Sequence, residues 1–141
     1  MGLQRLDHYS IRTPRLDETR RFYAEILDMH EGPRPPFPFP GAWMYSGDTA
    51  MVHLVGYDPA DAEGLKSYLG DKDVTSTGTG TIDHVAFAIT GLDTTLARLR
   101  AANLAFRERT VPNLGLHQVF VEDPNGVTLE LNFPAAEAPG A

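Results

Sequence analysis

The sequence contains no cysteine, which excludes disulfide bonds and thiolate metal ligands. Any bound metal must therefore use imidazole, carboxylate or water. No apolar run approaches the roughly 20 residues of a membrane-spanning helix, and the start of the chain lacks the apolar segment of a secretory signal. Lys and Arg number 12 against 19 Asp and Glu, which gives a net charge of -7. These features predict a cytoplasmic protein with no membrane or nucleic-acid partner.

The 141 residues are enough for one compact domain, and they contain an internal repeat. Leu6-Asp7-His8 matches Ile82-Asp83-His84, so that the two histidines are 76 positions apart. The same offset aligns Leu16 with Leu92. In each copy a segment of alternating polarity precedes a segment of helical periodicity. The repeat therefore predicts a duplicated βαβββ module within one α+β domain.

We place the first module at residues 1–56, a linker at 57–81, the second module at 82–134 and a flexible tail at 135–141. The first module is expected to begin with a strand at Leu6–Arg12 and a helix that ends at about Leu27. A proline-rich loop at Gly32–Gly41 and a hairpin of Ala42–Ser46 with Met51–Val55 are expected to follow. The second module is expected to begin with a strand at Ile82–Ile89 and a helix at Leu92–Ala102, with Asp93 as its cap. Three further strands are expected at Phe106–Arg109, Leu116–Glu122 and Val127–Phe133. The linker includes a short predicted helix at Ala60–Leu69.

Alternation along the predicted strands places four metal-binding side chains on one face, since the more apolar face should pack under the helices. They are His8, His53, His84 and Glu130. An ionised glutamate on an inward sheet face is costly unless it is paired or coordinated. Three imidazoles and a carboxylate suit Zn, Fe, Mn, Ni or Co. The pattern therefore predicts a divalent-metal site.

These motifs resemble the vicinal oxygen chelate superfamily, which includes glyoxalase I, extradiol dioxygenases and bleomycin-binding proteins. The resemblance runs from Leu6 to Phe133 and rests on Leu6-Asp7-His8, Ile82–Phe87, and Asp123-Pro124-Asn125-Gly126 followed by Leu129-Glu130-Leu131. It implies two modules whose sheets curve around a metal cleft, with His8, His84 and Glu130 as metal ligands. It also implies a small-molecule substrate that chelates the metal through adjacent oxygens.

His53 falls on the strand where glyoxalase I has a glutamate ligand, whereas extradiol dioxygenases have a non-ligand, acid–base histidine there. The resemblance therefore favours an extradiol-type dioxygenase with Fe2+ and with His53 as acid–base group. A role for His53 as a fourth ligand stays open. One alternative is a glyoxalase I-like or epimerase-like lyase or isomerase with Zn2+, Ni2+, Mn2+ or Co2+. Another is a metal-free, small-molecule-binding resistance protein.

His117 is a second catalytic candidate whose position depends on the turn before the last strand. A two-residue turn at Pro124-Asn125 would pair His117 with Asn132 and place it on the face of Glu130. A bulge at the turn would shift the register by one residue and remove His117 from that face.

Four further residues are candidates for the substrate pocket. Phe37, Phe39 and Trp43 either line a flat apolar pocket or form a plug under the proline-rich loop, and Arg12 either meets an anionic substrate or ends a strand in solvent. The resemblance also allows two assemblies. In the first, the two modules of one chain form one site. In the second, the modules pair across the homodimer that we expect, so that His8 and His84 of one site come from different chains.

Overall fold

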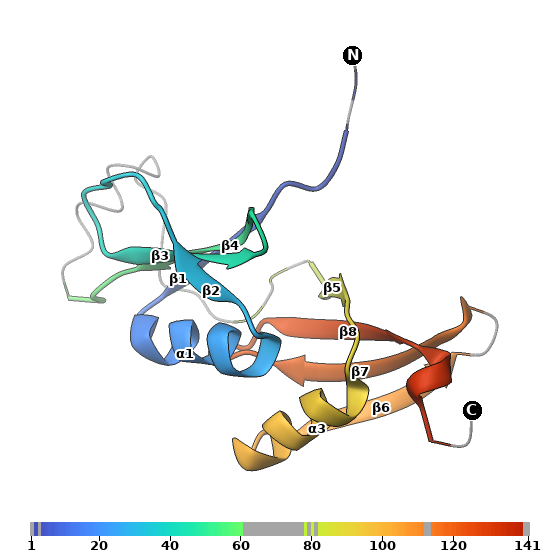
Figure 1. Cartoon of the computed structure of the whole chain (residues 1–141). Helices are drawn as coiled ribbons and strands as arrows, with labels where there is room; N and C mark the ends of the chain where they lie inside the picture. Colours follow the sequence, from blue (N-terminus) through green and yellow to red (C-terminus); the bar gives the residue numbers. More distant parts are fainter. Residues whose placement is uncertain are drawn as a thin grey trace. The chain divides into compact units, whose positions relative to one another are not determined.

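The computed structural model describes residues 2, 4–60, 78, 80, 82–111 and 114–139. The chain divides into two compact units, unit 1 (Met1–Ser76) and unit 2 (Thr77–Ala141). Each unit contains one four-stranded sheet and one βαβββ module, which confirms the predicted α+β fold (Figure 1). None of the described helices is long and apolar enough to span a membrane.

Unit 1 contains β1 (Tyr9–Thr13), α1 (Leu16–Leu27), β2 (His30–Gly32), β3 (Gly41–Ser46) and β4 (Thr49–Gly56). The strand order is β1-β4-β3-β2, and only the β1–β4 pair is parallel. Helix α1 packs on one face of this sheet, where its buried residues Phe22, Tyr23 and Ile26 meet the core (Figure 1). Alternation in β4 buries Val52 and Leu54 beneath the helix and directs His53 to the other face.

Unit 2 repeats this arrangement with β5 (Val85–Ala88), α3 (Leu92–Ala101), β6 (Phe106–Val111), β7 (Leu116–Glu122) and β8 (Thr128–Pro134). The order is β5-β8-β7-β6, with β5 parallel to β8. Leu129, Leu131 and Phe133 of β8 are buried in the core. Glu130 therefore lies on the opposite face of the sheet, as the alternation predicts.

The predicted elements agree closely with these strands and helices, with a few differences. The two first strands begin later than expected, and β2 was not predicted because His30-Glu31-Gly32 has neither apolar alternation nor β-branched residues. The helix expected at Ala60–Leu69 lies almost wholly outside the described residues, as does most of the linker.

The start of α3 corrects the expectation that Asp93 caps the helix. Asp93 lies in the first turn and makes no capping hydrogen bond; the residue before the helix is Gly91. The backbone N–H groups of Gly91 and Leu92 instead donate to Glu137 Oε1, at 2.9 and 3.2 Å. Glu137 belongs to the short 3-10 helix η2 (Ala135–Glu137), so this part of the predicted flexible tail is held by the helix N-terminus.

The turn between β7 and β8 has five residues rather than two. Asp123 Oδ1 accepts the N–H groups of Asn125 and Val127 at 2.8 and 2.9 Å, and Glu122 pairs with Thr128. Gly126 supplies the positive φ, +82°, that this loop needs. The register therefore pairs His117 with Phe133, and the expectation that His117 shares the face of Glu130 is wrong.

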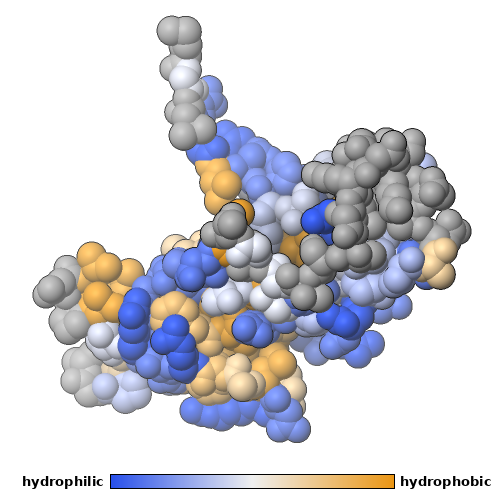
Figure 2. All heavy atoms as spheres, turned by 180° about the vertical axis from the view of Figure 1, so that it is seen from behind, coloured by the Kyte–Doolittle hydropathy of each residue, from blue (hydrophilic) through white to orange (hydrophobic). Residues whose placement is uncertain are grey.

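The face seen in Figure 2 mixes hydrophilic and hydrophobic side chains among the described residues. Two of the exposed large apolar residues are Leu6 and Ile82, with 81% and 64% of their surface exposed. They occupy equivalent positions in the two modules, each just before an Asp-His pair.

Candidate metal centre

His84 and Glu130 form a pair of potential metal ligands in unit 2. Glu130 lies in β8 with its side chain 12% exposed, and His84 lies just before β5. His84 Nε2 is 3.6 Å from Glu130 Oε1. Two atoms that each bind one ion at about 2.0–2.2 Å lie roughly 3–3.5 Å apart. The donor types and their separation thus fit a divalent metal such as Zn, Fe or Mn.

A carboxylate orients the imidazole of His84. Nδ1 of His84 lies 2.8 Å from Asp83 Oδ2, and a carboxylate accepts but does not donate. Nδ1 therefore carries a proton, and in the neutral ring the free lone pair is on Nε2, the nitrogen that lies 3.6 Å from Glu130 Oε1. This carboxylate–histidine arrangement is typical of metal-binding histidines.

His8 in unit 1 has the same arrangement. Its Nδ1 lies 2.7 Å from Asp7 Oδ2, which leaves Nε2 as the ligand-capable atom. The hydrogen bond with His8 is the main reason why the pKa of Asp7 lies below its ordinary value. The sequence repeat could have shown this role for Asp7 and Asp83, because each precedes its histidine by one residue, but the sequence suggested only that they cap or anchor loops.

Glu130 ends a chain of side-chain hydrogen bonds across unit 2. Arg109 Nε donates to Gln118 Oε1 at 2.6 Å, Gln118 Nε2 donates to Asn132 Oδ1 at 2.9 Å, and Asn132 Nδ2 donates to Glu130 Oε2 at 3.0 Å. Arginine can only donate and carboxylate can only accept, so the direction of both amides is fixed. The chain holds Oε2 and leaves Oε1 toward His84. Sequence analysis missed Gln118, Asn132 and Arg109.

His53 lies between two parallel rings in unit 1. Its ring centroid is 3.7 Å from that of His8, with planes 13° apart, and 3.9 Å from that of Trp43, with planes 11° apart. A metal binds in the plane of an imidazole at about 2.1 Å from nitrogen. The ring nitrogens of His8 and His53 lie in two nearly parallel planes and so do not point toward a common position.

The protonation state of His53 follows from its surroundings. Burial, and then the charge of neighbouring His8, lower the pKa of His53 below its ordinary value, which favours the neutral ring. Nε2 is 3.1 Å from the carbonyl oxygen of Ala50, so Nε2 carries the proton. Nδ1 is then the atom of His53 that can accept a proton.

The aromatic candidates form a continuous row in unit 1. Phe37 lies 6.5 Å from Trp43 and 5.3 Å from Phe39 by ring centroids. The guanidinium of Arg34 lies 5.1 and 5.4 Å from the two phenylalanine rings and donates to the Phe39 carbonyl oxygen. The proline-rich loop is thus organised around Arg34, which sequence analysis missed. The half-buried rings leave an aromatic surface that leads to His53.

The remaining two candidates differ in their placement. In β1, Arg12 follows Ser10 by two residues, and Ser10 pairs with His53 of β4. Arg12 therefore lies on the same face of the sheet as His53. His117 is buried on the core face of unit 2, where Nδ1 is 2.9 Å from Thr110 Oγ1 and Nε2 is 3.3 Å from Glu108 Oε2. These contacts indicate a structural role for His117.

Within the described ranges, no three His, Asp or Glu side chains come together as a metal-binding group. Each unit instead presents a histidine whose Nδ1 is held by a carboxylate, and unit 2 adds Glu130 beside it.

Several solved structures share the fold at low sequence identity. A mutant of the fosfomycin resistance protein FosX from Listeria monocytogenes, complexed with Mn(II) and 1S,2S-dihydroxypropylphosphonic acid, is 15% identical, with a TM-score of 0.67 and 94% of each chain covered. TnmS3, an antibiotic-binding protein from Streptomyces sp. CB03234, is 17% identical, with a TM-score of 0.65, covering 95% of this chain and 98% of its own. Lactoylglutathione lyase from Agrobacterium tumefaciens is 15% identical, with a TM-score of 0.61, covering 97% and 98%.

A search of curated proteins finds no significant match. The family model described as Glyoxalase/Bleomycin resistance protein/Dioxygenase superfamily matches residues 5–131. This range covers nearly all of both modules and includes both Asp-His pairs and Glu130. The chain therefore belongs to the glyoxalase/bleomycin resistance protein/dioxygenase superfamily, as the sequence motifs predict.

Proposed function

We propose that the protein is a divalent-metal-dependent enzyme acting on a small substrate that chelates the metal through two adjacent oxygens. The proposed ligands are His84 and Glu130 of unit 2 and His8 of unit 1, from one chain or from two copies. The observation that carries this is the His84–Glu130 pair, 3.6 Å apart, with each histidine held by its own aspartate. When bound, the metal supplies Lewis-acid chemistry to the substrate oxygens.

The lead reaction is ring cleavage of a catechol by an extradiol-type dioxygenase that uses Fe2+. Its support is the position of His53, which stacks on the proposed ligand His8 without lying in position to share an ion with it. The lowered pKa keeps His53 neutral near pH 7, so Nδ1 can take a proton from a substrate hydroxyl. The row formed by Trp43, Phe37 and Phe39 offers aromatic surface to a ring-shaped substrate.

A second candidate is a lyase or isomerase that moves a proton within its substrate, with Zn2+, Ni2+, Mn2+ or Co2+. It is supported by the fold shared with lactoylglutathione lyase. Here Glu130 or His53 would move the proton. A third candidate is a metal-free binding protein, which TnmS3 and the aromatic row of unit 1 support.

Three measurements separate these candidates. Protein purified without chelator is analysed for metal and then loaded separately with Fe2+, Zn2+, Ni2+ and Mn2+. A dioxygenase consumes one O2 for each catechol, whereas a lyase converts a hemithioacetal without O2. Absence of metal binding, together with unchanged ligand binding in His84→Ala, would exclude both enzyme functions and support the binding protein.

We also propose that the protein is a homodimer. The support is the exposure of Leu6 and Ile82, two apolar residues at equivalent positions that a second copy would cover. Light scattering of the wild type and of Leu6→Ser with Ile82→Ser tests this. A dimeric mass in the wild type and a lower mass in the double variant are expected; a monomeric wild type would contradict it.

A further inference from the structure

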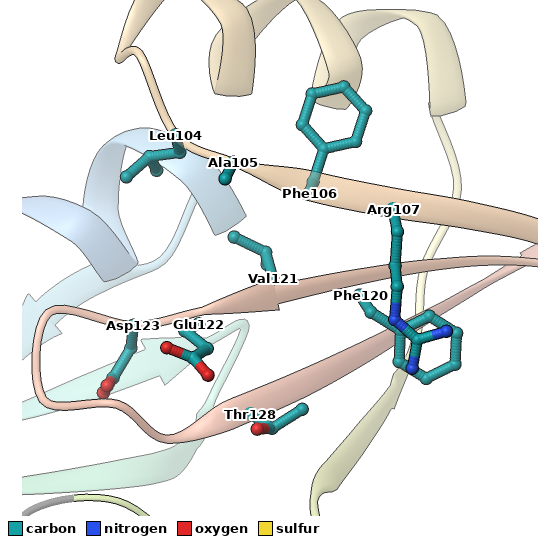
Figure 3. A pocket seen from close by; sticks show the side chains of 9 residues that line it. All are labelled: Leu104, Ala105, Phe106, Arg107, Phe120, Val121, Glu122, Asp123 and Thr128. Atoms are coloured by element: carbon teal, nitrogen blue, oxygen red, sulfur yellow. The ribbon is translucent and has the colours of Figure 1, made fainter.

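The edge of the sheet in unit 2 carries two arginines beside one aromatic ring. The guanidinium carbon of Arg107 lies 4.2 Å from the centroid of Phe120, and that of Arg109 lies 5.2 Å from it. Both arginines are exposed on β6, whereas Phe120 is 9% exposed. Figure 3 shows the side chain of Arg107 lying alongside the Phe120 ring.

Neither of these two arginines makes an ion pair with another residue that the structure describes. They are two positions apart on one strand and share a face, roughly 7 Å apart along the backbone. Glu108 between them points to the other face, where its Oε2 meets His117. Among the described residues neither arginine has a carboxylate within ion-pair distance, and only Arg109 has a hydrogen-bond partner, Gln118. An anion between two such guanidiniums relieves their mutual repulsion.

The strand register connects this pair to the candidate metal centre. Glu130 pairs with Phe120, and Phe120 pairs with Arg107, so the three residues form one row across β8, β7 and β6. Adjacent strands lie about 4.8 Å apart, which places β6 about 10 Å from β8. A ligand that binds a metal at Glu130 with one end and extends over Phe120 would reach Arg107 with its other end. Arg107, Phe120 and Thr128 also line a pocket of about 640 Å3 (Figure 3). Two acidic residues line it as well: Glu122, and Asp123, whose Oδ1 accepts backbone N–H groups of the turn.

We propose that Arg107, assisted by Arg109, binds an anionic group of the substrate. The substrate class is then a compound with two adjacent oxygens at one end and a carboxylate at the other, separated by about the width of one aromatic ring. The planar fork of arginine suits a carboxylate, which it binds through two parallel hydrogen bonds. This inference rests on the proposed function, because Glu130 and His84 locate the chelating end.

Calorimetry on the full-length, Mn2+-loaded protein tests this with two probes, catechol and 3,4-dihydroxybenzoate. The wild type is expected to bind the acid about tenfold more tightly than catechol, since a charge-assisted hydrogen bond is added. Arg107→Met is expected to abolish this preference and to change catechol affinity by less than about twofold. The matched control is Arg100→Met, because Arg100 lies 5.7 Å from Phe106, whose register places it on the opposite face of the sheet.

The outcomes separate this inference from the proposed function. Equal affinity of the wild type for the two probes, or a preference that survives Arg107→Met, would overturn the anion site and leave the metal centre standing. Binding of neither probe by a protein that holds no metal would overturn both. Circular dichroism of each variant shows whether the fold is retained, and Arg107→Lys, which keeps the charge on the same strand, is expected to retain part of the preference.

Discussion

The imidazole of His53 lies parallel to that of His8, with ring centroids 3.7 Å apart and planes 13° apart. This stacking bears on two roles of His53 that the sequence leaves open, that of a metal ligand and that of an acid–base group. A co-ligand would direct its nitrogen at the same ion as His8, whereas a stacked ring is placed to exchange a proton with a substrate beside that ion. This stacking is the basis of the proposal that His53 is not a metal ligand.

Replacement of His53 with Gln is therefore expected to separate catalysis from metal binding. Turnover should fall by about 100-fold or more, since a positioned acid–base group contributes 10²–10⁴-fold. The metal dissociation constant should rise by less than about tenfold. Steady-state kinetics and metal titration of the same preparation measure both, with His8→Ala as the control that loses metal. An equal loss of metal affinity in the two variants would make His53 a ligand.

The hydrogen-bond chain to Glu130 predicts an effect of residues that do not touch the metal. Asn132→Leu removes the donor to Glu130 Oε2 and should weaken metal binding about 10- to 100-fold, with a smaller effect for Gln118→Met. Thr128→Val, in the same strand and on the same face, is the matched control. The unfolding temperature of the metal-free protein should change little. Unchanged metal affinity in Asn132→Leu would show that Glu130 is oriented without this chain.

The lowered pKa of His53 predicts a pH dependence of stability with a definite sign. The folded protein holds His53 with a pKa below the ordinary 6.5, so just below pH 6.5 the unfolded chain binds more protons than the folded chain. The contribution of His53 is present above about 6.5 and is lost as the pH falls toward the folded pKa. Metal-free wild type should therefore lose more stability than His53→Gln between pH 7 and 5. Parallel unfolding curves for the two proteins over this range would contradict the cause assigned to the shift.

The cap on α3 predicts a stability effect from a residue in the C-terminal segment. Glu137→Ala removes the acceptor for the N–H groups of Gly91 and Leu92 and should lower the free energy of unfolding by about 0.5–2 kcal/mol. Glu25→Ala, at an exposed position of α1, should change it by no more than about 0.5 kcal/mol. Urea denaturation measures both. An equal and small change in the two variants would mean that the end of the helix is stabilised by other groups.

Most of the fold follows from local features of the sequence. The alternation of apolar and polar residues predicts the strands that contain His53 and Glu130. The helical spacing of apolar residues predicts the helix Leu16–Leu27. The alternation also predicts the faces of the sheets on which His53 and Glu130 lie. The turn at Asp123 could not be predicted in this way, because the Asp123 side chain stabilises a five-residue turn in place of the expected two-residue turn, and this longer turn shifts the register of His117 by one residue.

The site residues were predicted only in part, for a similar reason. His8, His84 and Glu130 belong to motifs, whereas Gln118 and Asn132 acquire their role only from the pairing of β7 with β8. The stacking of His53 between His8 and Trp43 likewise depends on the register of three strands and on ring rotamers. Such cross-strand contacts join residues far apart in the chain, and no local pattern reports them.

The most direct test of the metal centre is a titration of metal-free protein with Mn2+ or, without oxygen, Fe2+. We expect about one ion per chain in the wild type and a loss of affinity of at least 100-fold in each of His8→Ala, His84→Ala and Glu130→Gln. His117→Ala, at a buried position away from Glu130, should still bind if folded. A wild type that binds no ion, or full affinity in His84→Ala and Glu130→Gln, would contradict the account.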